Sequence, residues 1–395
     1  MWINRDLAAF LDTKAGGLPV QIMIGPRQTG KTSLFRHISD KDFNFVSFDD
    51  LQNRDLAQKD PAFFLSQHEG NLILDEVQYV PNLFNEIKKR IDEERFLSRP
   101  PVFYRMTGSN QILMDKNIKE TLVGRASYFN LNTLSVNEIT EQDKKHSIIS
   151  ILFKGGWPQL YNEPGTDVVD YLNDYINSFV EKDIARTAGI EKVDAFLSVT
   201  KFLANRAGEL LNYDSVSKDS GVVSNTVKEW VAVLERIGIV YRLRPYSSNL
   251  NKRLTKQPKI YFWDTGLAVR LQGFRDEATL RSNPKLGNLF ENLVCAEILK
   301  WKNNFRKNIE IYLWHTKDGE EVDFIIKGTD KTVFIESKMA MQGVEPVMIP
   351  DDLKKDFPHV DKVVIVTYGG DIKTISHSCV QVPLYKLANY LNSAS

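Results

Sequence analysis

One short segment near the N-terminus restricts the possible folds of this chain more than any other feature. Residues 25–32 read Gly-Pro-Arg-Gln-Thr-Gly-Lys-Thr and follow the apolar run Ile-Met-Ile at residues 22–24. This spacing is typical of a glycine-rich turn that joins the end of a buried strand to the start of a helix. Such a turn directs backbone N–H groups and the positive end of the helix toward phosphate oxygens. The sequence therefore predicts an α/β fold with a phosphate-binding loop formed by Gly25, Pro26, Arg27, Gln28, Thr29, Gly30, Lys31, Thr32 and Ser33.

A second apolar run ends in two carboxylates. Residues 72–76 read Leu-Ile-Leu-Asp-Glu, so Asp75 and Glu76 stand where a buried strand ends. We expect Lys31 to reach the β- and γ-phosphates of a nucleotide, and Thr32 and Asp75 to hold Mg²⁺. Glu76 is then placed to orient and deprotonate an attacking water. Two strands that end in complementary halves of one site predict an enzyme that binds and hydrolyses ATP with Mg²⁺.

Five strand-like runs alternate with helical patterns in the first third of the chain, at residues 20–24, 43–48, 72–74, 102–106 and 128–131. This alternation predicts a parallel sheet with helices on both faces, and ligands of such sheets lie beyond the carboxyl ends of the strands. Ser109 or Asn110 follows the fourth run and is expected to reach between the γ-phosphate and the attacking water. Ser109 could equally cap the N-terminus of a helix, a role that does not exclude the first.

Composition limits the remaining possibilities. A chain of 395 residues is long enough for two or three domains. Its 51 basic and 51 acidic side chains balance, so any contact with nucleic acid must come from local patches. Cys295 and Cys379 are too few for a disulfide framework or a zinc site, which is typical of a reducing compartment. With no signal-peptide pattern and no apolar run near about 20 residues, the sequence predicts a cytoplasmic protein without a membrane span.

Four motifs together resemble a prokaryotic family of AAA+ ATPases that carry a fused C-terminal domain of unknown function. They are the loop at 25–32, Leu-Asp-Glu-Val-Gln-Tyr-Val-Pro at 74–81, Thr-Gly-Ser-Asn at 107–110 and Leu-Val-Gly-Arg at 122–125. The resemblance implies a homo-oligomer, a hexamer, in which Arg125 enters the neighbouring subunit's site. The alternative for Arg125 is an ordinary surface ion pair. Residues 1–145 are then the ATPase domain, and residues 146–191 are a helical connector.

Residues 192–272 resemble a winged helix. A helical pattern over 192–211, a polar segment, a second helix capped by Ser224 and a strand at 239–243 follow in that order. In such modules the start of the second helix faces the major groove of DNA, which indicates Asn225, Thr226 and Lys228. The alternative is a protein-docking module with a solvated hairpin. Under the DNA interpretation, phosphates are contacted by a basic strip at 241–263, namely Arg242, Arg244, Lys252, Arg253, Lys256 and Lys259, with Tyr241, Tyr246 and Tyr261 between them.

Residues 273–395 resemble the PD-(D/E)xK nuclease fold. A helix with Glu291 precedes a strand with Asp323, and a hairpin leads to a strand with Glu336 and Lys338. Residues two apart on a strand project from one face, so Glu336 and Lys338 are expected to share a pocket that Asp323 can join. Oxygen ligands of this kind suit Mg²⁺, with Glu291 holding a metal-bound water or a second ion and Lys338 positioning the nucleophile. The alternative is a retained fold in which Glu336 and Lys338 form a structural ion pair.

Three functions are consistent with these patterns. The first is an oligomeric, Mg²⁺-dependent ATPase that binds and remodels DNA, duplex or branched. The second is a nucleotide-gated defence or signalling nuclease, and the third is a protein-remodelling ATPase with docking domains. A small-molecule kinase is disfavoured, because Glu76 places a water-activating carboxylate where a kinase requires none.

Overall fold

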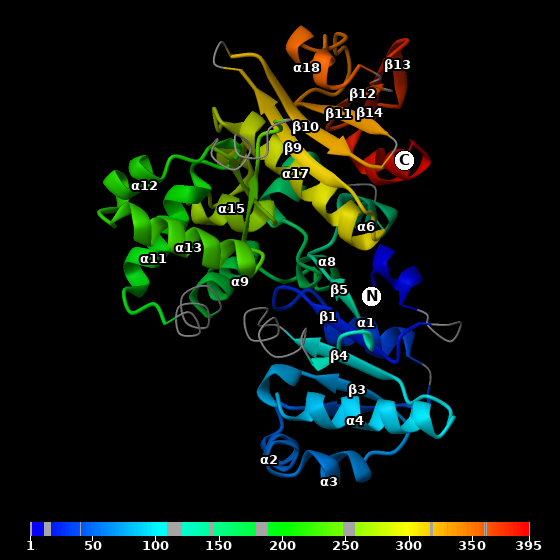
Figure 1. The fold of residues 1–395 in the computed structure, drawn as a ribbon. Helices are drawn as coiled ribbons and strands as arrows, with labels where there is room; N and C mark the ends of the chain where they lie inside the picture. The colour runs from blue at the N-terminus through cyan, green and yellow to red at the C-terminus, as the bar shows by residue number, and fades with distance from the viewer. Residues whose placement is uncertain are drawn as a thin grey trace. The chain divides into compact units, whose positions relative to one another are not determined.

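The computed structural model describes residues 2–11, 17–39, 41–108, 121–142, 146–178, 189–247, 257–316, 319–329, 331–358, 360 and 362–394. The chain divides into two compact units, which can be followed by colour in Figure 1. One unit comprises residues 4–132 and 303–305, and the other comprises residues 1–3, 133–302 and 306–395. Within the described ranges, no helix combines the length and the apolar character that crossing a bilayer requires.

The first unit is built on the predicted parallel sheet, whose strands lie in the order β2-β3-β4-β1-β5. The interior strands β1, β3 and β4 are almost wholly buried, whereas the edge strand β2 exposes Asn44 and Phe45. Because β4 separates β1 from β3, the glycine-rich loop and the two carboxylates leave the sheet one strand apart. The strands are β1 (Val20–Ile24), β2 (Phe43–Ser47), β3 (Asn71–Asp75), β4 (Tyr104–Gly108) and β5 (Ala126–Asn130).

Helices of this unit begin where the sequence supplies capping groups. The Asp50 carboxylate accepts the N–H groups of Gln52 and Asn53 at the start of α2. Asp60 caps α3 in the same way, with Pro61 in the first turn, where a missing N–H is harmless. The helices are α1 (Lys31–Ile38), α2 (Leu51–Lys59), α3 (Pro61–Ser66) and α4 (Leu83–Phe96), with 3₁₀ turns η1 (Asp6–Phe10) and η2 (Val77–Tyr79).

The part of the second unit that follows residue 132 starts with short helices. Trp157 is fully buried and stacks on Tyr175 with ring centroids 4.3 Å apart. Gly155 and Gly266 lie so close to the backbone or side chains of other segments that a Cβ at either position would clash. The helices are α6 (Val136–Gln142), α7 (Ile148–Lys154), α8 (Gln159–Asn162) and α9 (Val168–Tyr175).

The middle of this unit contains several helices and a small antiparallel sheet in the order β6-β8-β7. The polar segment expected between the first two helices is itself the helix α12, which buries only Val216. With one apolar residue in two turns, its helical period could not be read from the sequence. The elements are α11 (Val193–Ala204), β6 (Glu209–Leu210), α12 (Tyr213–Ser220), α13 (Ser224–Arg236), β7 (Val240–Leu243), β8 (Lys259–Phe262), α15 (Thr265–Leu271) and α16 (Glu277–Arg281).

A six-stranded sheet in the order β13-β14-β12-β11-β10-β9 forms the C-terminal part. Strands β9, β10 and β11 form an antiparallel meander, and β11, β12 and β14 run parallel. The elements are α17 (Leu286–Asn304), β9 (Glu310–His315), β10 (Glu321–Lys327), β11 (Thr332–Lys338), α18 (Asp351–Asp356), β12 (Lys362–Thr367), β13 (Lys373–Ser376), β14 (Cys379–Pro383), η4 (Leu384–Lys386) and α19 (Leu387–Ala394).

Candidate functional site

The glycine-rich loop folds closely around the end of β1. A Cβ atom on Gly25 would lie 2.1 Å from the backbone oxygen of Leu131, so only glycine fits at the start of the loop. Gly30 has a φ of +87° and forms the N-cap of α1, a left-handed conformation that glycine adopts without steric cost. Thr29 is buried, and its hydroxyl donates to the carbonyl oxygen of Pro26 at 3.0 Å. The close packing of Gly25 against Leu131 and the hydrogen bond from Thr29 to Pro26 together fix the conformation of the loop.

Lys31 is buried at the beginning of α1. Its ammonium donates to the carbonyl oxygens of Gly25 at 3.1 Å and Pro26 at 2.6 Å. Burial lowers its pKa to about 8, although the carboxylates of Glu76 and Asp75 act in the opposite direction. The ammonium therefore lies inside the curve of the loop, where an anionic ligand would restore its proton affinity.

Arg5 fixes the loop from outside, and sequence reasoning missed it. One guanidinium nitrogen donates to the carbonyl oxygen of Thr29 at 2.8 Å, and another donates to that of Asn132 at 2.7 Å. The buried arginine thereby ties the loop to the segment that follows β5. No sequence motif marks this role, because residues 5, 29 and 132 meet only in the folded sheet.

The end of β3 faces the loop. The Thr32 hydroxyl donates to the Asp75 carboxylate at 2.5 Å, which joins the first turn of α1 to β3. Thr107, at the end of β4, donates to the same carboxylate oxygen. Burial raises the pKa of Asp75, while these two hydroxyl donors oppose the rise. A hydroxyl and a carboxylate in contact form the oxygen-donor pair that suits Mg²⁺.

Glu76 has a φ of +57°, a left-handed conformation that is rare for a residue with a side chain. Its backbone N–H donates to the Thr107 hydroxyl at 3.4 Å, and its carboxylate accepts a hydrogen bond from the Gln78 amide. Strain of this kind often marks functional positions. Thr107 and Gln78 were missed as site residues, although both lie inside the motifs that the sequence singled out.

The remaining loop residues differ in exposure. Pro26 is buried, whereas Arg27, Gln28 and Ser33 are exposed. Ser109 and Asn110, the two predicted sensor residues, lie outside the described residues. Thr107 is therefore the polar side chain that the described part of β4 brings to the carboxylates.

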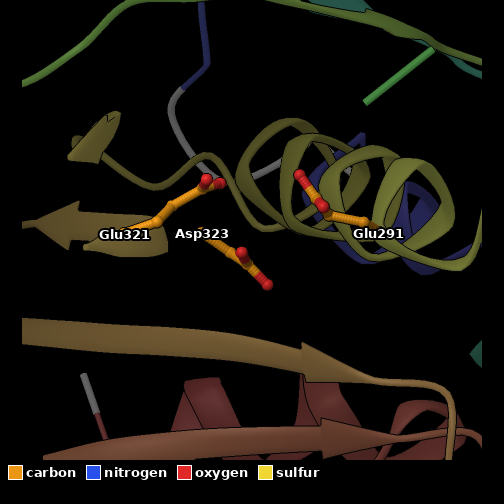
Figure 2. Close-up of side chains that lie close together, drawn as sticks. All are labelled: Glu291, Glu321 and Asp323. Carbon is orange, nitrogen blue, oxygen red and sulfur yellow. The ribbon is translucent and has the colours of Figure 1, made fainter. Parts of the chain in front are cut away.

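A second group of acids lies in the C-terminal part. Figure 2 shows Glu291 on α17 facing Glu321 and Asp323 on β10. Each offers one carboxylate oxygen, and these three oxygens lie within 4.8 Å of one another. Burial raises the pKa of Glu291 to about 7, and the charge of Asp323 acts in the same direction. Glu321 was not predicted, although its position two residues before Asp323 on one strand is a usable signal.

A lysine and a tyrosine from β8 complete this acid group. The Lys259 ammonium donates to Glu291 at 2.8 Å and also contacts Glu321, and the Tyr261 hydroxyl donates to Glu291. Burial opposes the charge of Lys259, but the two carboxylates raise its pKa above the ordinary value. The prediction that Lys259 contacts DNA phosphates is therefore wrong, because its side chain is 7% exposed and paired with acids.

The predicted nuclease residues are only partly brought together. Glu336 accepts the backbone N–H of Asp323 at 3.4 Å, but its carboxylate is not part of the three-oxygen group. Its pKa is raised to about 8 by burial and by the charge of Asp323. Lys338 lies 3.5 Å from Glu336 with half of its side chain exposed. Asp323 is held by Ser337, whose N–H and hydroxyl donate at 2.8 Å and 2.7 Å.

The helix α13 presents part of the predicted groove-facing surface. Asn225 and Lys228 are exposed and Thr226 is half-buried, while Val227, Val231 and Leu234 face the core. Ser224 does not cap this helix, because Val223 holds the N-cap position. The Ser224 hydroxyl instead donates to the Asp214 carboxylate at 2.7 Å.

The basic strip is smaller than the sequence indicated. Arg242 is paired with Glu235 and donates to the Tyr213 hydroxyl at 3.0 Å, so its charge is compensated within the fold. Tyr246 and Tyr261 are buried in the core and cannot stack on bases. Lys252, Arg253 and Lys256 lie outside the described residues.

Comparison with known protein families divides the chain into three segments. Residues 18–140 match the model of an AAA domain. The N-terminal domain is an AAA-family P-loop ATPase domain. Residues 145–278 match a domain of unknown function, DUF8612, and residues 286–387 match another, DUF4143. Lys259 and Tyr261, which contact the acid group, therefore belong to the segment that matches DUF8612. The three carboxylates belong to the segment that matches DUF4143.

Several proteins are similar over most of the chain. An uncharacterized protein of Mycobacterium tuberculosis is 28% identical over 328 residues, which cover 82% of this chain and 71% of the relative. One of Haemophilus influenzae is 24% identical over 366 residues, which cover 84% of each. Among solved structures, the Aeropyrum pernix ORC2 protein is 12% identical and covers 60% of this chain and 85% of its own, with a TM-score of 0.35.

Within the AAA domain, Arg125 precedes β5 and lies at the amino-terminal end of the sheet, opposite to the loop. Its guanidinium makes two hydrogen bonds to the Asp92 carboxylate of α4, at 2.7 Å and 2.8 Å. This contact is the surface ion pair that the sequence left as the alternative. A role in a neighbouring subunit stays a prediction.

Proposed function

We propose that the protein is a Mg²⁺-dependent ATP hydrolase. The observation that carries the proposal is the hydrogen bond of 2.5 Å between Thr32 and Asp75, which sets two oxygen donors beside the loop and its buried lysine. The match of residues 18–140 to an AAA domain supports it independently.

The roles of the residues follow from their positions. Backbone N–H groups of the loop would hold the phosphates, and the Lys31 ammonium would move from the carbonyl oxygens of Gly25 and Pro26 to phosphate oxygens. Bound by Thr32 and Asp75, Mg²⁺ would neutralise phosphate charge. Glu76 would accept a proton from the water as its oxygen bonds to the γ-phosphorus and the bond to ADP breaks.

Two variants test this proposal. Lys31→Ala should weaken ATP binding measured by calorimetry, because the loop loses its only buried cation among the described residues 25–32. Glu76→Gln should bind ATP but lower turnover by about 100-fold or more, the usual effect of losing a general base. Glu69→Gln, an exposed residue before β3, is the control and should behave as wild type. Unchanged turnover in Glu76→Gln would exclude its role as base.

We further infer that this ATPase acts on DNA. Support comes from the order helix, strand, helix, helix, strand, strand over α11, β6, α12, α13, β7 and β8, with β8 between the other two strands. This order is consistent with the resemblance to a winged helix. The exposed start of α13, with Asn225 and Lys228, is the surface that would enter a groove. Protein docking by the same surface is the competing interpretation.

The acid group supports a second candidate function, metal-dependent cleavage of a phosphodiester. Glu291, Glu321 and Asp323 supply three oxygen donors in one place, and such donors fit Mg²⁺ or Mn²⁺. A bound ion would lower the pKa of a water, and Lys259 would hold the carboxylates of Glu291 and Glu321 in place. Nicking of plasmid DNA with Mn²⁺ should occur in the wild type and be lost in Asp323→Ala and Glu321→Ala, each of which removes one of the three oxygen donors. No nicking by the wild type would leave these acids a structural role.

A further inference from the structure

A large cavity in the second unit is not used by any of the functions above. Its volume is about 1010 Å³, the upper end of the range of small-molecule sites. It is lined by α6, the start of α7, the end of α16 and the segments that follow β11 and β12. No residue of the glycine-rich loop or of the acid group lines it.

The position of the cavity in the fold is one that ligands favour. Strands β11, β12 and β14 are parallel neighbours, and residues that line the cavity follow the carboxyl ends of the first two. In α/β sheets, ligands bind in the crevice outside these ends. The acid group lies on α17 and β10, and none of its residues lines the cavity, so the cavity is a separate site.

One wall of the cavity is rigidly built. Gly370 has a φ of +88°, and a Cβ atom there would lie 2.5 Å from the backbone oxygen of Met341. The Tyr385 hydroxyl donates to the Gly370 carbonyl oxygen at 3.1 Å. The Tyr368 N–H donates to the carbonyl oxygen of Ala340, also at 3.1 Å. These contacts fix the turn after β12 against the segment after β11, so the wall is formed before any ligand arrives.

The charges on the lining favour an anion. Arg281 is exposed, and no carboxylate of the described chain pairs with its guanidinium. Lys386 lies 3.4 Å from the carboxylate of Asp371, which is 90% exposed, so that ion pair is weak, and its ammonium also lies 5.4 Å from the centre of the Tyr385 ring. Glu141 is the one acid among the described lining residues, and it already accepts a hydrogen bond from the Asn137 amide. A phosphate group would find two available cations here.

The rest of the lining favours a flat, partly apolar group. Met339 and Met341 supply adaptable side chains, and Tyr368 supplies an aromatic surface. Asn137 and Asn389 add amide donors and acceptors, which are held 3.4 Å apart by a long hydrogen bond. We propose that the cavity binds a nucleotide, with its phosphate on Arg281 and Lys386 and its base against the methionines and Tyr368. An acidic peptide would use the cations but not this flat apolar surface.

The experiment uses the full chain with Lys31→Ala, in EDTA, so that the glycine-rich loop does not contribute. Binding of the four nucleoside monophosphates is measured by calorimetry, beside a 5′-phosphorylated dinucleotide and a glutamate-rich peptide. We expect at least one monophosphate to bind, and Arg281→Gln to weaken its binding by about tenfold or more. Arg275→Gln removes an exposed arginine that does not line the cavity, and it should leave binding unchanged.

The outcomes show whether the ligand is a free nucleotide or the end of a nucleic-acid strand. Tighter binding of the dinucleotide than of any monophosphate, again reduced by Arg281→Gln, identifies the end of a strand as the ligand and supports the proposal. Binding of the peptide alone overturns it. The proposal is also overturned if Arg281→Gln and Arg275→Gln weaken nucleotide binding equally. It is overturned as well if no nucleotide binds to the Lys31→Ala protein although that protein has the melting temperature of the wild type.

Discussion

Gly25 shows how strongly a single atom can be constrained in this protein. Its added Cβ would meet the Leu131 backbone oxygen, which is part of the strand end and cannot rotate away. Gly25→Ala should therefore lower the free energy of unfolding of the ATPase unit by about 1–3 kcal/mol and abolish nucleotide binding. Gly70→Ala is the matched control, because Gly70 also has a positive φ but no atom near its added Cβ. Equal losses in urea unfolding of both variants would show that backbone conformation alone matters.

The buried carboxylate of Glu336 makes stability depend on pH. Its pKa is raised from 4.5 to about 8 by burial and by Asp323, so the folded chain binds this proton more tightly than the unfolded chain. The resulting stability is complete below about pH 4.5 and is lost as the pH rises through about 8. Glu336→Gln, which keeps a neutral side chain, should gain in melting temperature over wild type from about pH 5 to about pH 8, then keep a constant advantage.

Glu345→Gln, an exposed substitution, should follow the wild type at every pH. An advantage of Glu336→Gln that is the same at about pH 5 and about pH 9 would contradict the raised pKa.

Residues that carry chemistry through local spacing could be predicted, and residues that act across the sheet could not. Thr32 and Asp75 stand in recognisable motifs, and the structure brings their side chains into contact. Arg5 and Thr107 reach the same site only because β4 and β5 flank β1 in the sheet. Lys259 looked like a solvated cation because its acidic partners, Glu291 and Glu321, are 32 and 62 residues away.

At the scale of elements, the strands were predicted better than the polar helix. Runs of buried apolar residues identified β1 and β3, since a strand covered on both faces needs them. The helix α12 escaped because its stability comes from packing against α11 and α13 and from its Asn212 cap, rather than from an apolar stripe. The group of Glu291, Glu321 and Asp323 depends on how α17 and β10 approach one another, which strand spacing does not give.

The ion pair between Arg125, which precedes β5, and Asp92 on α4 allows the role of Arg125 to be tested. The pair with Asp92 is partly exposed, so it contributes little to stability. If Arg125 acts in a neighbouring subunit's site, Arg125→Ala should slow ATP turnover by about 100-fold or more while ATP binding is retained. Asp92→Asn breaks the same pair but keeps the arginine, and it should leave turnover near the wild-type rate. Equal effects of the two variants on turnover would restrict Arg125 to a structural ion pair.

At the scale of the whole molecule, balanced charge removes any general attraction to DNA. The 51 basic and 51 acidic side chains mean that binding must come from a few local contacts such as Lys228. Burial of Lys259 and pairing of Arg242 reduce the number of available cations further. The salt dependence of DNA binding is therefore expected to be shallow, with a slope that reports only a small number of phosphate contacts.

The decisive measurement is ATP turnover against single-stranded, duplex, forked and four-way DNA. At least one of these should raise turnover, and the effect should fall as salt is added, because phosphate contacts release counterions. Lys228→Gln should reduce the stimulation and leave basal turnover intact, since the residue lies on α13 in the second unit. Lys218→Gln, an exposed lysine on α12, is the matched control and should keep full stimulation. Equal loss in both variants would indicate general charge attraction, and no stimulation by any DNA would favour docking of a protein on α13.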